Sequence, residues 1–82
     1  MGEQYFRGVL AAFLGANFMN AHITEKEIDL IKEFISHFEE ERIKRSPLLY
    51  QEKEDQKRQM KQSLEAYIHG VKETLRAGGK LL

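Results

Sequence analysis

The stretch from residue 5 to residue 19, YFRGVLAAFLGANFM, has almost no polar face. Arg7 carries its only charge, and Asn17 is its only other strongly polar side chain. A helix that is apolar on every side must be covered on every side. The rest of an 82-residue chain offers little material for this. We therefore expect a second copy of the chain, or another protein, to complete the core.

The small size of the chain favours self-association. A domain of this length buries only about 60–65% of the surface that its unfolded chain exposes. Small domains compensate with disulfides, a bound metal or oligomerisation. The sequence has no cysteine, which excludes disulfides and thiolate zinc sites. We expect a homodimer, because two-fold association needs only one self-complementary surface.

Charge and hydropathy argue against several classes of protein. Thirteen acidic residues balance thirteen basic ones, so no net charge attracts the chain to nucleic acid or to anionic lipid. The apolar run at residues 9–14 is too short for a signal peptide and far below the ~20 residues of a membrane span. The lack of cysteine is compatible with a reducing compartment. We expect a soluble, cytoplasmic protein that does not bind membranes.

The clearest helix start lies at Thr24. Glu27 stands three residues later, as in a capping box, and Ile23 and Ile28 have the spacing of a hydrophobic staple. This predicts a helix from about residue 25 to about residue 45. Its apolar positions form one broad stripe: Ile28, Leu30, Ile31, Phe34, Ile35 and Phe38.

Ser46 and Pro47 predict the next boundary. Proline suits the first helical position, which makes Ser46 the expected N-cap of a third helix. This helix is expected to span about residues 47–77, where a Gly-Gly pair ends it and leaves a flexible tail at 78–82. Its apolar stripe comprises Met60, Leu64, Tyr67, Ile68, Val71 and Leu75.

These elements predict a single all-α domain over residues 1–82. A hydrophobic helix at about residues 3–19 would pack on a long antiparallel hairpin formed by the second and third helices. The polar segments 39–45 and 51–59 would then lie side by side, as a charged arm that extends away from the core. Dimerisation is expected to complete this three-helix fold. The predicted oligomer core comprises Phe6, Val9, Leu10, Phe13, Leu14 and Phe18, faced by Ile31, Phe34, Ile35, Phe38, Leu64, Ile68 and Val71.

Three apolar residues, Leu48, Leu49 and Tyr50, follow the proline at the tip of this arm. One interpretation is an exposed contact point for a protein partner, with Arg42 and Arg45 beside it. The alternative is that the three side chains close the turn or pack against a second chain.

No motif for catalysis or cofactor binding is present. The sequence has no Gly-rich phosphate loop, no nucleophile elbow and no His-Glu-x-x-His. We therefore predict no catalytic residue, no metal and no cofactor. Glu33, His37, Glu40 and Glu41 have ligand-like spacing, but we interpret them as an ordinary charged helix face.

The resulting hypothesis is a non-enzymatic helical module for protein–protein interaction, an adaptor or regulator that self-associates through its first helix. One alternative is a nucleic-acid-binding regulator that uses the basic residues near the hairpin tip. Acidic residues interleave with these bases and would repel phosphates, which argues against it. A second alternative is an assembly protein that forms higher oligomers.

Overall fold

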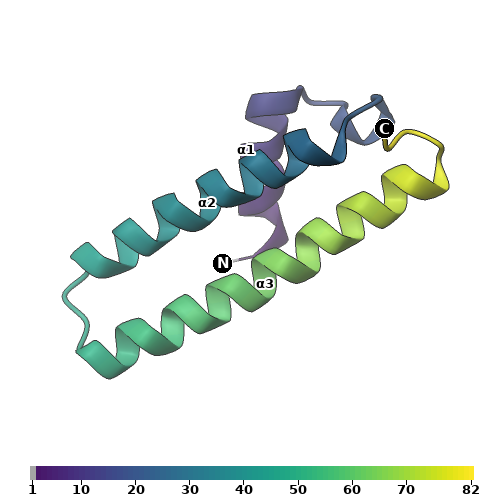
Figure 1. Cartoon of the computed structure of the whole chain (residues 1–82). Helices are drawn as coiled ribbons and strands as arrows, with labels where there is room; N and C mark the ends of the chain where they lie inside the picture. The colour runs from purple at the N-terminus through teal and green to yellow at the C-terminus, as the bar shows by residue number, and fades with distance from the viewer. Residues whose placement is uncertain (1) are drawn as a thin grey trace.

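The computed structural model describes residues 2–82, which form an all-helical chain (Figure 1). Helix α1 spans Glu3–Leu14, a 3-10 turn η1 spans Phe18–Asn20, α2 spans Glu25–Arg45 and α3 spans Tyr50–Ala77. The only extended pairing within the described residues is an isolated bridge between Ile23 and Leu81. The predicted all-α class with three α-helices is confirmed.

Helix α2 begins at the predicted residue because Thr24 caps it. The backbone N–H of Glu27 donates to Thr24 Oγ1 at 3.1 Å. The Thr24 hydroxyl in turn donates to Glu27 Oε1 at 2.9 Å. Ile23 and Ile28, the two residues of the predicted staple, are both buried and hold the entry of the chain against the core.

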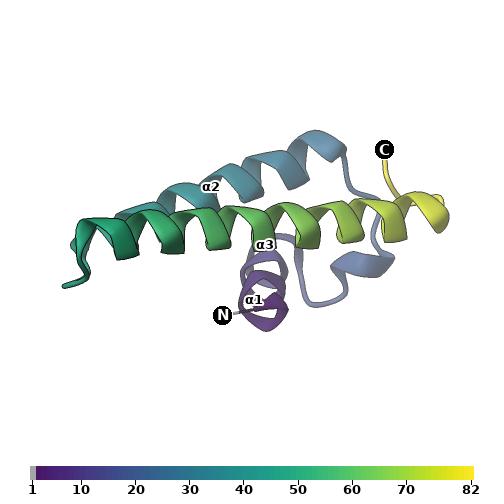
Figure 2. The same cartoon turned by 90° about the horizontal axis from the view of Figure 1, so that it is seen from below.

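Helices α2 and α3 run antiparallel and side by side, and α1 crosses one face of this hairpin (Figures 1 and 2). Ion pairs between the two long helices hold their register, among them Lys72–Asp29 at 2.6 Å and Lys61–Glu40 at 3.2 Å. The hydrogen bond from Lys72 to Asp29 raises the pKa of the lysine. The buried core lies where the three helices meet and comprises Phe6, Leu10, Phe18, Ile23, Ile28, Ile31, Ile35, Leu64, Ile68, Val71 and Leu75.

Helix α1 ends earlier than predicted, at Leu14 instead of residue 19. Gly15 has φ 101° and ψ 154°, a conformation that leaves the helix and that only glycine adopts readily. The chain then turns through η1, which carries Phe18 into the core with 1% of its surface exposed. The apolar stretch therefore forms two elements and not one helix: α1 buries Phe6 and Leu10, and η1 buries Phe18.

Alanine is expected to have opposite effects on stability at Gly15, which ends α1, and at Gly8, which lies within α1. Gly15→Ala is expected to lower the free energy of unfolding by about 1–3 kcal/mol, because alanine is strained at this φ and ψ. Gly8→Ala is the matched control, since an added Cβ meets nothing within 4 Å at either position. Gly8→Ala should stabilise α1 by about 0.5–1 kcal/mol, because Gly8 is an exposed position within the helix. Urea unfolding of both variants measures the difference, and equal effects would contradict this account.

The turn between the long helices also differs from the prediction, because α3 begins at Tyr50 and not at residue 47. Ser46 ends α2 instead of starting α3: its backbone N–H and its hydroxyl donate to the carbonyl oxygen of Ile43 at 3.1 and 2.6 Å. Leu49 takes the N-cap position of α3. Its N–H donates to Glu52 Oε1 at 3.2 Å, so a glutamate in the first turn supplies the cap.

The C-terminal residues 78–82, predicted to be a flexible tail, are hydrogen-bonded to the start of α2. The N–H of Ile23 donates to the carbonyl of Lys80 at 3.0 Å, and the N–H of Leu82 donates back to the carbonyl of Ile23 at 2.8 Å. Leu81 packs against the core. Gly79, with φ 69°, makes the turn that brings this segment back.

The turn end of the hairpin extends past α1 (Figure 2). Its α2 side is less exposed to solvent than the sequence suggests. Glu39 and Ile43 belong to the segment predicted to be an exposed charged arm, and both are buried, with 2% and 1% of their surfaces exposed. Between residues 44 and 63 no side chain is buried. The correction therefore applies to the α2 side, while residues 51–59 at the start of α3 are exposed or half-buried.

Candidate functional site

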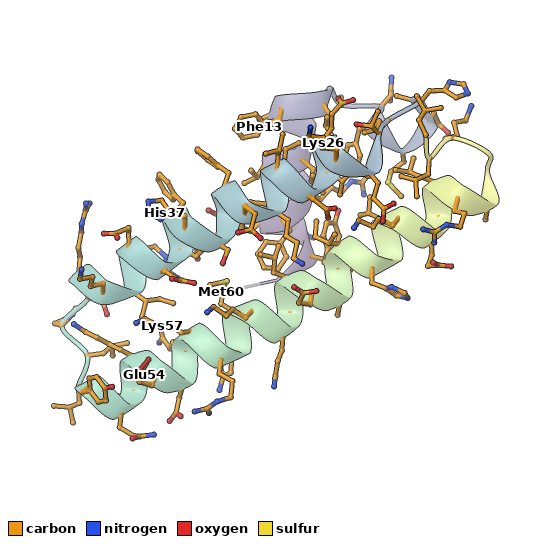
Figure 3. All side chains as sticks on the ribbon, in the orientation of Figure 1. Phe13, Lys26, His37, Glu54, Lys57 and Met60 are labelled. Atoms are coloured by element: carbon orange, nitrogen blue, oxygen red, sulfur yellow. The ribbon has the colours of Figure 1, made fainter. Side chains whose placement is uncertain are left out.

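Four large apolar side chains stay exposed together on the outer side of the hairpin. They are Phe13 of α1, with 56% of its surface exposed, and Leu30, Phe34 and Phe38 of α2, with 62%, 51% and 56%. The ring centroids of Phe13 and Phe34 are 5.2 Å apart, edge to face, and those of Phe34 and Phe38 are 6.0 Å apart and stacked. We call these four residues the aromatic face. Figure 3 shows Phe13 and His37 on the side of α2 that points away from α3.

The aromatic face exists because α2 carries two apolar lines. The core-facing line includes Ile28, Ile31 and Ile35, which are buried. Leu30, Phe34 and Phe38 recur every four residues on a second line, roughly 100° around the helix from the first. α1 and α3 bury the first line, whereas the second line meets α1 at Phe34, through Phe13, and stays at least half-exposed. The sequence interpretation merged both lines into one stripe and placed Phe34 and Phe38 in the core, so it missed this surface.

The area of the aromatic face is large for so small a chain. A half-exposed phenylalanine leaves about 100 Å² in contact with water, so the four residues present roughly 400 Å² of apolar surface. A contiguous patch of this size on a small protein is often a binding surface. A typical protein interface takes about 800 Å² from each partner. The aromatic face would supply about half of one side of such an interface.

Charged residues continue the line of the aromatic face along α2. Glu27 precedes the apolar residues, and Glu41 and Arg45 follow them at helical spacing. A groove at the C-terminal end of α2, beside Phe38, is lined by His37, Phe38, Glu41, Arg42, Arg45 and Ser46. The apolar centre is therefore bordered by an acidic end and by a mainly basic end.

Most of the residues predicted to form the oligomer core are already buried within one chain. Phe6, Leu10 and Phe18 expose 3% or less of their surfaces. Val9 and Leu14 are partly buried against the same core. Phe13 is the member of the set that is largely exposed.

The residues predicted as an interaction tip differ in their exposure and in what lies around them. Leu49 and Tyr50 are exposed, at 73% and 76%, while Leu48 is half-buried. Arg42 and Arg45 instead line the groove beside Phe38, whose lining does not include the three tip residues.

Glu39 forms a buried acidic centre between α1 and α2. Its Oε2 accepts a hydrogen bond from the Tyr5 hydroxyl at 3.1 Å, and its Oε1 accepts one from Arg42 Nη2 at 2.9 Å. Burial, with a further contribution from Glu39, raises the pKa of Tyr5. The hydrogen bond to Glu39 raises the pKa of Arg42. Since each carboxylate oxygen accepts a hydrogen bond from the chain itself, Glu39 forms a structural tie between Tyr5 of α1 and Arg42 of α2.

A cleft of about 310 Å³ opens beside this tie, between α2 and α3. Both apolar and polar residues line it: Phe6, Glu39, Arg42, Ile43, Gln56, Gln59, Met60 and Ser63. The volume is at the lower limit for small-molecule pockets, and its carboxylate and guanidinium are bonded to each other. Figure 3 shows Met60 on the side of α3 that faces α2.

Three basic residues of α3 near the hairpin tip have partners within the chain itself. Lys57 lies 3.6 Å from Glu54, Arg58 lies 3.0 Å from Asp55, and Lys53 donates to the carbonyl of Lys44 at 2.7 Å. These contacts reduce the positive potential that a phosphate backbone would meet. Within residues 2–82, no three His, Asp or Glu side chains are grouped so that they could hold a metal ion.

In the part of the chain that the structure describes, no helix combines the length and the apolar character needed to cross a membrane. A search against family models, curated proteins and solved structures found no match to the chain.

Proposed function

We propose that the chain is a non-enzymatic protein-interaction module that self-associates through the aromatic face. The observation that carries the proposal is the cluster of three half-exposed phenylalanines and one leucine, with rings in mutual contact. Aromatic side chains are enriched at protein interfaces, and a few residues near the centre of an interface carry most of its binding energy. The self-association expected of the first helix is thereby narrowed to Phe13, acting together with the outer line of α2.

A second copy is the occupant that best fits this surface. The aromatic face is bordered by both acidic and basic residues of one helix, so two identical copies offer each other complementary charges. A surface that pairs with itself around a two-fold axis is fully buried in the dimer, so no further chain can bind to it. The expected product is therefore a closed dimer, and not the growing oligomer of an assembly protein.

Sedimentation equilibrium between about 1 and 100 μM tests the proposal. We expect the mass to approach that of two 9.6 kDa chains without further growth. The dissociation constant should be micromolar, because the apolar centre is about half of a standard interface. Phe34→Ser is expected to be monomeric over this range, with unchanged helicity by circular dichroism.

Leu49→Ser is the control, because it removes an apolar side chain outside the aromatic face that is even more exposed than Phe34, at 73% against 51%. It should associate like the wild type. A wild-type chain that keeps a mass of 9.6 kDa at the highest concentration would overturn the proposal, and so would an association that Phe34→Ser leaves intact.

A further inference from the structure

We infer that the two copies pair antiparallel along α2, with the acidic start of each α2 against the basic end of the partner's α2. This inference rests on the proposed self-association and specifies its geometry. The occupant of the aromatic face is thus a second copy of this chain, in one orientation and one register.

The spacing of the residues on α2 supports this register. Glu27 precedes Phe34 by seven residues, and Arg45 follows Phe38 by seven residues. All four lie near one side of the helix, because Glu27 and Arg45 are separated by five turns of 3.6 residues. In an antiparallel pair, positions at equal distances on opposite sides of the axis face each other. An axis at the level of residue 36 therefore brings Phe34 opposite the partner's Phe38, and Glu27 opposite the partner's Arg45.

Electrostatics favours the antiparallel orientation over the parallel one. The first turn of α2 is acidic at Glu25 and Glu27, and its last turn is basic at Arg42, Lys44 and Arg45. A parallel pair would place like charges together at both ends, and would also align the two helix dipoles. In an antiparallel pair, opposite charges meet at both ends and the two helix dipoles point in opposite directions. The groove beside Phe38, with Arg42 and Arg45 in its lining, is then the receptor for the partner's Glu27.

Exposure leaves these charges free to meet a partner. Glu27 and Arg45 are both exposed in the single chain. Glu27 uses Oε1 to accept from the Thr24 hydroxyl, which leaves its second oxygen for a contact between chains. Glu25, by contrast, lies 3.4 Å from Lys72 of its own chain, so Glu27 is the better candidate for the intermolecular pair.

Cysteine cross-linking tests the register directly, since the chain has no native cysteine. We would mix Glu27→Cys with Arg45→Cys and add a short bis-maleimide at a concentration where the wild type is dimeric. The mixed adduct is expected, and each variant alone should give little product, because like positions lie about 27 Å apart along an antiparallel pair. A self-adduct of Glu27→Cys would indicate a parallel pair and overturn the inference. If the wild type is dimeric but no combination of the two cysteine variants gives an adduct, the inference is overturned as well.

Charge reversal supplies an independent measurement. Glu27→Lys and Arg45→Glu should each raise the dissociation constant at least about tenfold, because each disrupts two symmetry-related contacts. Mixing the two variants restores both contacts, so the mixture should form heterodimers at a concentration where each variant alone is monomeric. Lys44→Glu is the control: it makes the same charge change one residue away, off the line of contact, and should shift the dissociation constant less than about threefold.

The outcomes separate this inference from the proposed function. If the wild type dimerises through the aromatic face but the mixture behaves like its components, the register is wrong and the self-association stands. If the wild type stays monomeric, both fail. The helicity of Glu27→Lys is checked first, because Glu27 also caps α2; the cysteine experiment decides the register if that variant loses helix.

Discussion

Phe18→Ala is expected to lower the free energy of unfolding by about 3–5 kcal/mol. Phe18 is the largest of the fully buried side chains, with 1% of its surface exposed. Its ring lies in the short turn η1, from which it contributes to the core alongside residues of α1, α2 and α3. A domain of 82 residues has only about 4–12 kcal/mol of stability in total. This single change should therefore remove at least about a quarter of the total stability.

Phe13→Ala is the matched control for Phe18→Ala, because it makes the same change at a position with 56% exposure. At low protein concentration, where the chain is monomeric, its cost should be below about 1 kcal/mol. At high concentration it should weaken self-association instead. Urea unfolding at two protein concentrations measures both effects. Equal losses for the two variants at low concentration would show that the turn η1 does not place Phe18 in the core.

Arg42→Ala is expected to have the second largest effect, a loss of about 2–3 kcal/mol. The substitution removes the strongest partner of Glu39 and leaves a carboxylate that is 2% exposed with only the Tyr5 hydroxyl. The loss is smaller than for a fully buried pair, since the Arg42 side chain is 47% exposed. Lys44→Ala, two residues further along α2 and exposed, should change stability by less than about 0.5 kcal/mol.

A double substitution distinguishes a buried charge from lost packing as the cause. Glu39→Met combined with Arg42→Met replaces the ion pair by apolar side chains of similar length, and buried pairs replaced in this way often lose little or no stability. We expect the double variant to unfold within about 1 kcal/mol of the wild type. A double variant as unstable as Arg42→Ala would indicate that the arginine stabilises through its packing, and not by compensating Glu39.

Local signals explain what could be predicted from the sequence. The start of α2 was predictable because Thr24 and Glu27 complete the cap within one turn. The antiparallel hairpin followed from two long helical patterns joined by a short turn that contains Pro47. In each case the deciding interactions join residues close together in the chain.

Contacts between distant residues account for most of what was missed. Glu39 stands in a run of three glutamates that is typical of a solvated helix, and its burial depends on Tyr5, thirty-four residues away. The end of α1 was misplaced because a glycine within an apolar stretch fits a helix interior as well as a helix end. The φ of 101° at Gly15 distinguishes the two, and the residue pattern does not reveal it.

The aromatic face was missed for a different reason. Both apolar lines of α2 have helical spacing, and together they form a stripe that is wider than one neighbouring helix covers. The sequence does contain the signal: Leu30, Phe34 and Phe38 recur every four residues on their own. What it lacks is the direction from which α1 and α3 approach, which decides the line that is left uncovered.

The absence of buried side chains between residues 44 and 63 has a consequence for motion. Beyond the helical backbone hydrogen bonds, this end of the hairpin is held mainly by exposed polar contacts, such as the hydrogen bond from Lys53 to the carbonyl of Lys44, so we expect it to open locally at a fraction of the global free energy. Its amide hydrogens are expected to exchange with solvent much faster than those between Leu64 and Leu75, which belong to the core. The end that carries Leu49 and Tyr50 can therefore fray and re-form while the rest of the molecule stays folded.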